Sequence, residues 1–173
     1  GRIRTHRAGF EFTLPRARTD AMVAGKQKSS MSRTLLNPEM HVAHQIPTVH
    51  EYCQMRIMAG LSPKSEEAAT IGLPNSLFAA TIRDDQNNLL AMGRLVGDGG
   101  CFVQVCDIAV RPDHQGKGLG RHIMQELMDY ADQNLPAGAF VNLFADGTAN
   151  ALYRKFGFGE TAPKSIGMAK YAK

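Results

Sequence analysis

The stretch Val110-Arg-Pro-Asp-His-Gln-Gly-Lys-Gly-Leu-Gly-Arg121 joins an apolar segment to an amphipathic one and decides the fold. Before it, residues 101–110 are nearly all apolar and rich in β-branched side chains, which is typical of a strand buried on both faces. After it, apolar residues recur at helical spacing, so we predict a helix over 119–134. The sequence therefore predicts a buried strand, a glycine-rich turn and a helix, in that order.

The turn has the composition of an anion-binding site. Gly116, Gly118 and Gly120 carry no Cβ, so the backbone can approach a ligand closely. The free N–H groups and the dipole of a helix start favour an anion. Lys117 and Arg121 add positive charge at the same place. We therefore predict a cradle for a diphosphate here.

The spacing of the glycines excludes two common phosphate motifs. No Gly-Lys pair is followed by Ser or Thr, as a Walker loop requires, and the glycines do not fit G-x-G-x-x-G. What fits is Gln115-x-x-Gly118-x-Gly120, which resembles the coenzyme A loop of the GNAT superfamily of N-acetyltransferases. For the loop taken alone, a helix-capping glycine turn is the alternative.

Length and composition favour one domain without a membrane span. The chain has 173 residues and 43% hydrophobic content, which is enough for a core. It shows no apolar run of membrane-spanning length and no signal peptide. Three cysteines without Cys-x-x-Cys spacing argue against a disulfide scaffold or a zinc site. We therefore expect a cytoplasmic protein without a metal.

The positive charge of the chain belongs to its first residues. Residues 1–30 hold seven Lys or Arg against two acidic residues, whereas the remainder holds 13 basic and 14 acidic residues. We expect residues 1–37 to be a basic tail, either added for expression or left from a targeting segment, ahead of a domain over 38–173. The near-neutral domain gives no case for nucleic acid.

The order of the predicted elements indicates a mixed α/β (α+β) fold. A first strand over 40–44 precedes a helix that begins after Thr48, and Ser65 begins a second short helix. Further elements are two strands that form a hairpin, the central strand and helix, a fifth strand, a short helix and two weaker strands: 76–83, 89–96, 101–110, 119–134, 140–145, 148–155, 158–160 and 166–171. An antiparallel meander therefore leads into a β-α-β crossover.

A second motif strengthens the resemblance to the GNAT superfamily. The segment 142–158 contains Ala149, Tyr153, Gly157 and Phe158 in the A-x-x-x-Y-x-x-x-G-F pattern that ends the family's fold. Asp146 stands where many members have Asn, and Asn150 lies nearby but out of register. The Leu-Phe-Ala-Asp spelling locally resembles the arylalkylamine (serotonin) N-acetyltransferase branch.

The resemblance implies a site for acetyl-CoA between two splayed parallel strands, 101–110 and 140–145. It also implies a small-molecule amine acceptor, such as an arylalkylamine, a polyamine or an amino sugar, and leaves a homodimer open. The residues that it assigns to acetyl-CoA binding are Ile108, Ala109, Val110, Gln115, Gly116, Lys117, Gly118, Leu119, Gly120, Arg121, Asp146, Asn150 and Tyr153.

Acetyl transfer from a thioester to an amine needs an oxyanion donor, a base and an acid. The resemblance assigns the donor to the backbone N–H of Ile108 and the acid to Tyr153. An alkylamine is almost fully protonated at neutral pH, and Asp107 could take its proton. The alternative for Asp107 is a buried, hydrogen-bonded structural carboxylate. In a regular strand Gln104, three residues earlier, falls on the opposite face.

Two other functions stay open at this point. One is a peptide or protein N-acetyltransferase, which would need an open groove. The other is a module that binds acetyl-CoA without turnover. Such a module would need neither an acid nor a base, so Tyr153 and Asp107 argue against it.

Overall fold

The computed structural model describes residues 39–147 and 149–171. The predicted basic tail, residues 1–37, lies outside the described residues, so its nature stays a prediction.

One five-stranded mixed sheet forms the centre of the described domain. Its strands lie in chain order, and the first four are antiparallel while the last pair is parallel. The strands are β1 (Met40–Ala43), β2 (Phe78–Asp84), β3 (Leu89–Gly97), β4 (Phe102–Val110) and β5 (Phe140–Asn142). The predicted meander and β-α-β crossover are confirmed.

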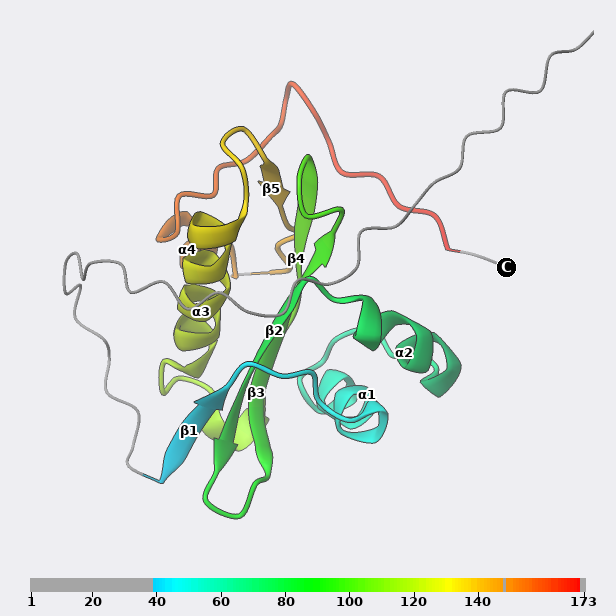
Figure 1. Cartoon of the computed structure of the whole chain (residues 1–173), viewed down its shortest axis with the longest axis vertical. Coiled ribbons are helices and arrows are strands. Elements are labelled where there is room, and N and C mark those ends of the chain that lie inside the picture. Colours follow the sequence, from blue (N-terminus) through cyan, green and yellow to red (C-terminus); the bar gives the residue numbers. More distant parts are fainter. Residues whose placement is uncertain (1–38, 148, 172–173) are drawn as a thin grey trace, which may run out of the picture. The chain divides into compact units, whose positions relative to one another are not determined.

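Helices cover both faces of the sheet (Figure 1), with α1 and α2 on one side and α3 on the other. The α-helices are α1 (Val49–Met58), α2 (Glu66–Gly72), α3 (Leu119–Asn134) and α4 (Asn150–Arg154). Short 3-10 turns lie at η1 (Leu73–Asn75) and η2 (Pro112–His114). The predicted bounds of α3 are confirmed at both ends.

Side-chain caps fix the starts of α1 and α2. Thr48 and Glu51 form a capping box, in which each side chain accepts a hydrogen bond from the other residue's backbone N–H. The Ser65 hydroxyl accepts from the backbone N–H of Ala68. Both predicted helix starts are therefore confirmed.

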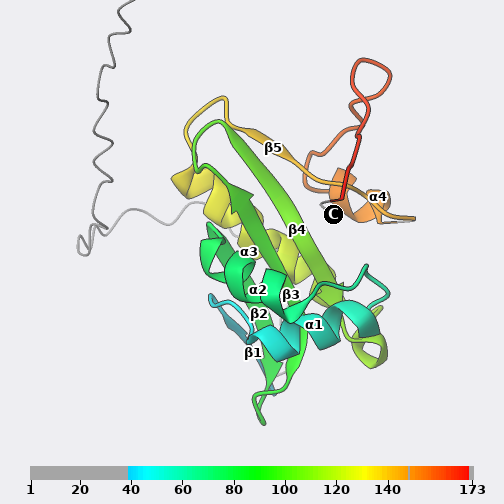
Figure 2. The same cartoon turned by 90° about the vertical axis from the view of Figure 1, so that its right-hand side faces the viewer.

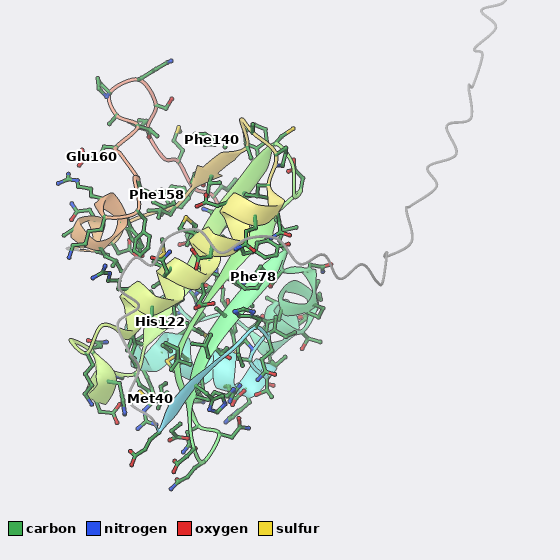
Figure 3. All side chains as sticks on the ribbon, turned by 60° about the vertical axis from the view of Figure 1, so that its left-hand side comes forward. Met40, Phe78, His122, Phe140, Phe158 and Glu160 are labelled. Carbon is green, nitrogen blue, oxygen red and sulfur yellow. The ribbon has the colours of Figure 1, made fainter. Side chains whose placement is uncertain are left out.

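Each face of the sheet has its own core. Buried residues of α3, including Ile123, Met124 and Leu127, pack on one face. Tyr52 and Met55 of α1 pack on the other, against β3 and β4. Phe78 of β2 stacks on Tyr130 of α3 with ring centroids 4.3 Å apart, and Figure 3 labels Phe78 beside this helix. β4 thus contributes buried side chains to both cores.

A β-bulge interrupts the pairing of β3 with β4. Met92 pairs with Ala109 but Arg94 pairs with Cys106, so Asp107 and Ile108 together oppose the single residue between, Gly93. Asp107 has a φ of 61°, a left-handed conformation that Asp tolerates better than most residues.

The bulge corrects one prediction. Because the extra residue reverses the alternation of side chains, Asp107 lies on the α1 face, where it reaches Tyr52 and Arg56. Val105 belongs to the core under α3, which places Gln104 on the α1 face as well. The prediction that Gln104 and Asp107 lie on opposite faces was therefore wrong, because the strand is not regular.

Gly93 leaves room for the bulge. A Cβ at this position would lie 2.5 Å from Cγ2 of Ile123 and 2.6 Å from Cδ1 of Ile108. These two isoleucines therefore close over the glycine and join α3 to the bulge.

The parallel strands separate after three residue pairs. The pairing of β4 with β5 ends at Gln104 and Asn142, so β5 is shorter than the predicted 140–145. Figure 2 shows the chain after β5 running away from β4 toward α4. The separation leaves the second half of β4 without a neighbour from β5.

The weak strands predicted at 158–160 and 166–171 are not present, because the described residues from 157 to 171 form no strand. Pro163 offers no N–H to a sheet, and the glycines at 157, 159 and 167 weaken extended pairing.

Candidate active site

The glycine-rich turn holds the start of α3 open to an anion. Gly116 and Gly118 have φ values of 75° and 84°, a region in which other residues are strained. Gly118 is the N-cap of α3, and no side chain caps this helix end. The first N–H groups of a helix have no partner within the helix, so they are free to bind an anion here.

The side chains around this turn leave its positive charge available. Lys117 and Arg121 are exposed. The Gln115 side chain donates a 3.1 Å hydrogen bond to the carbonyl of Val110, which ties the turn to the end of β4. Gly120 differs from Gly116 and Gly118, because it lies inside α3. A Cβ added at Gly120 would make only ordinary van der Waals contacts.

Asp113 and Arg111 brace the segment before the turn. The carboxylate of Asp113 accepts hydrogen bonds from the Nε and Nη2 of Arg111, at 3.0 and 2.5 Å, and lies 2.9 Å from Nδ1 of His114. The hydrogen bond from Arg111 and then that from His114 hold the pKa of Asp113 well below its ordinary value. Arg111 is therefore neutralised locally, unlike Lys117.

The predicted contacts to the pantetheine arm lie on the free part of β4. Ile108, Ala109 and Val110 follow the point where β5 leaves the sheet, and Ile108 is the second residue of the bulge. A strand edge without a partner offers N–H and C=O groups to an extended ligand. The loop at 115–121 continues directly from this edge.

Asp107 lies beneath the bulge in a buried ionic cluster. Its two carboxylate oxygens accept hydrogen bonds from Nη1 of Arg56 and Nε of Arg94, and the hydroxyl of Tyr52 donates a third at 3.3 Å. The side chains of Asp107, Arg56 and Arg94 are only 7%, 9% and 17% exposed. We refer to Tyr52, Arg56, Arg94 and Asp107 as the arginine cluster.

Burial and charge act together on the groups of this cluster. Burial, followed by the charge of Asp107, raises the pKa of Tyr52, so its hydroxyl stays protonated. Burial would lower the pKa of Arg94, but the hydrogen bond and charge of Asp107 outweigh it and raise this pKa. Both guanidinium groups also lie over the Tyr52 ring, 5.7 and 5.6 Å from its centroid.

Tyr153 lies on α4, packed against the core under α3. Its ring meets that of Phe158 edge to face at 6.4 Å, and Figure 3 labels Phe158 beside this helix. Burial, and then the charge of Asp146, raises the pKa of Tyr153. Asp146 and Asn150 are both exposed. The structure thus brings Asp146 near Tyr153, while Asn150 begins the helix.

Sequence reasoning missed Tyr52, Arg56 and Arg94. A usable signal was present, because Arg94 stands in the middle of an apolar strand and Asp107 in the middle of the next. Charges buried in apolar strands need partners. A regular strand, however, would have placed Asp107 on the other face.

A separate hollow of about 510 Å³ lies beside α1, between the β2–β3 turn and Arg111. The charged residues that line it are Glu51, Arg111 and Asp113, and each is in an ion pair. The residues predicted for acetyl transfer, Asp107, Ile108 and Tyr153, do not line it.

The described part of the chain offers neither a metal site nor a helix that could span a membrane. Within residues 39–147 and 149–171, no group of His, Cys, Asp and Glu is arranged to hold a metal ion. In the same part of the chain, every helix is too short or too polar to cross a membrane.

Comparison with known proteins decides the family. The model of the Acetyltransferase (GNAT) family matches residues 34–158, which include the strand, the glycine turn, α3 and α4. The chain belongs to the GNAT family. A structure from methicillin-resistant Staphylococcus aureus, described as a probable acetyltransferase of unknown function, is 45% identical. It covers 77% of this chain and 99% of its own, with a TM-score of 0.74.

Curated relatives of this GNAT chain are more distant. The uncharacterized N-acetyltransferase ycf52 of Pyropia yezoensis is 25% identical over 128 residues, which are 72% of each chain. The chloroplastic serotonin N-acetyltransferase 2 of rice is 35% identical over 82 residues, or 47% of this chain and 40% of its own length. The chain also spans about half the length of the Porphyra purpurea ycf52 protein that it matches. The cytoplasmic location stays a prediction.

Proposed function

We propose that the chain is an acetyl-CoA-dependent N-acetyltransferase whose acceptor is a primary amine on a small molecule. The observation that carries the proposal is the continuity of three features: the free half of β4, the glycine turn and the uncapped start of α3. These features fit the arm and the diphosphate of acetyl-CoA, which supplies the thioester when it is bound.

The binding residues have separate tasks in this proposal. The backbone N–H groups at 116–121, with Lys117 and Arg121, hold the diphosphate. The backbone of Ile108, Ala109 and Val110 pairs with the arm. The N–H of Ile108 stabilises the negative charge that develops on the carbonyl oxygen, a contribution of about 10²–10³ in rate.

Asp107 could be either a catalytic base or a structural carboxylate, and the hydrogen-bond donors around it favour the structural role. Its carboxylate accepts from Arg56, Arg94 and Tyr52, so a proton on it would displace at least one of these bonds. We propose that Asp107 is a positioning residue that holds the arginine cluster under the bulge. The acceptor then loses its proton to water before it attacks.

That proton loss sets a limit on the rate. An amine with a pKa near 10.4 is neutral for about one molecule in a thousand at pH 7.4, which corresponds to about 4 kcal/mol. A net positive charge near the amine disfavours its ammonium form and reduces this penalty.

Tyr153 is the proposed acid. As the amine nitrogen forms its bond to the acetyl carbon, the C–S bond breaks and its electron pair stays on sulfur. Because the pKa of Tyr153 is raised, its hydroxyl carries the proton that the thiolate needs at neutral pH. The nitrogen carries an extra proton after the attack and releases it to solvent as the amide forms. Solvent then returns a proton to the tyrosine.

A thiol-release assay tests the proposal. Each reaction contains the protein, acetyl-CoA and one class of acceptor: arylalkylamines, polyamines, amino acids or peptides. Release with small amines supports the proposal. Release with peptides alone would favour a peptide or protein acetyltransferase, and binding of acetyl-CoA with no release would favour a non-catalytic module.

A further inference from the structure

The arginine cluster carries one more positive than negative charge. Arg56 and Arg94 face a single carboxylate, that of Asp107. Burial, followed by the charge of Asp107, raises the pKa of Cys106, so this neighbouring thiol adds no negative charge. Lys64 in the α1–α2 loop lies close enough to act on Cys106 electrostatically, and so adds positive charge.

An excess charge at a buried site needs compensation. An unpaired ion is costly to remove from water, and a buried cluster is stable when each charge has a partner. Backbone carbonyls supply part of this, since Arg56 donates to Ser62 at 2.7 Å and Arg94 donates to Gly72 at 3.3 Å. A carbonyl carries only a partial charge, so the cluster remains positive.

Each guanidinium group also keeps a donor without a protein partner. The hydrogen bonds of Arg56 and Arg94 use Nε and Nη1, and within the described residues neither Nη2 has a partner. Within the described residues, neither Nη2 is among the side-chain atoms that are both fully buried and without a hydrogen bond. Both free donors therefore keep access to solvent.

We propose that these donors bind a carboxylate on the acceptor, so that the substrate is an amino-acid-like amine. The inference rests on the proposed function, because the bulge above the cluster is the proposed place of acetyl transfer. The Lys64 ammonium, which lies 6.0 Å from the centroid of the Tyr171 ring, adds positive charge beside Cys106 at the edge of the cluster. Polycationic amines are repelled from such a site.

The test compares pairs of amines that differ by one carboxylate. Thiol release is measured with 4-aminobutyrate against butylamine, and with phenylalanine against 2-phenylethylamine. We expect kcat/KM to be about 10–100-fold higher for the carboxylate in at least one pair, the ratio given by one charge-assisted hydrogen bond. A ratio near one or below it in both pairs, with thiol release intact, overturns the inference and leaves the proposed function standing.

Variants locate the effect. Arg94→Gln should reduce the ratio about tenfold, and Lys64→Gln, an exposed position, should reduce it less. Lys155→Gln, an exposed charge after α4, should leave the ratio as it is. If Arg94→Gln does not fold, Lys64→Gln decides. A ratio that stays unchanged in Lys64→Gln, and in Arg94→Gln where that variant folds, overturns the inference.

A binding measurement separates this inference from the proposed function. If no amine releases thiol, the proposed function fails. Calorimetric titration of the complex with CoA then tests whether the arginine cluster binds a carboxylate. Tighter binding of 4-aminobutyrate than of butylamine supports the carboxylate site. Equal binding, or none, overturns it.

Discussion

Replacing Asp107 by Asn tests whether the arginine cluster is a buried ionic unit. The substitution keeps the size of the side chain but removes the one negative charge between Arg56 and Arg94. Breaking a buried ion pair typically costs about 3–5 kcal/mol, because a charge is left buried without its partner. Total stability is about 5–15 kcal/mol, so this loss is large. For a domain of this size it lowers Tm by about 10–15 °C.

Thermal and urea unfolding measure the effect. The control is Asp132→Asn on the exposed face of α3, for which we expect a change within about 0.5 kcal/mol. In a double-variant cycle, Arg94→Met should cost less in the Asp107→Asn background than alone, with a coupling of at least about 1 kcal/mol. If Asp107→Asn were as stable as the control, the cluster would not exist as described.

The same variant separates the two roles of Asp107. As a positioning residue it affects the rate through Arg56 and Arg94, so the pH at which the rate rises should stay where it is in the native protein. As a base it would set that pH itself. A pH–rate profile that loses its rising limb in Asp107→Asn would contradict the structural role.

Three further predictions concern the acid, an ion pair and the bulge. Tyr153→Phe should lower kcat by about 10²–10⁴ with little change in the KM for acetyl-CoA, and equal turnover would reject the acid role. The hydrogen bond from Arg83 is the main cause that lowers the pKa of Glu51 from 4.5 to about 2, so its stabilisation is complete above about pH 5 and is lost as the pH falls toward 2. Glu51→Gln should therefore cost about 2 kcal/mol in urea unfolding at pH 7 and less at pH 3, whereas a difference that does not depend on pH would contradict the pair. Gly93→Ala should cost about 1–3 kcal/mol, because its Cβ would lie 2.5 Å from Ile123, and a neutral effect would contradict the close packing at the bulge.

Local signals predicted most of the fold. Thr48 and Ser65 marked helix starts because a side-chain oxygen before an apolar period caps free N–H groups. The central strand and α3 were predicted from one apolar run and one helical period. The structure of residues 157–171 was predicted wrongly, because the short apolar segments on either side of Pro163 carry no pattern that selects a partner strand.

The site was predicted in part. The glycine turn carries its chemistry in adjacent residues, so the sequence alone indicates an anion-binding loop. The arginine cluster joins α1, β3 and β4, and its geometry depends on the bulge at Asp107. A bulge shifts the register by one residue without a distinct sequence mark, so the side that Asp107 faces could not be derived.

Calorimetric titration of the protein with coenzyme A tests the central claim most directly. We expect one molecule to bind per chain, with a Kd between about 1 μM and 1 mM. Gly118→Ala, which strains the turn, should weaken binding about tenfold. No detectable binding at millimolar coenzyme A would contradict the account of the turn, the free edge of β4 and the acetyl transfer built on them.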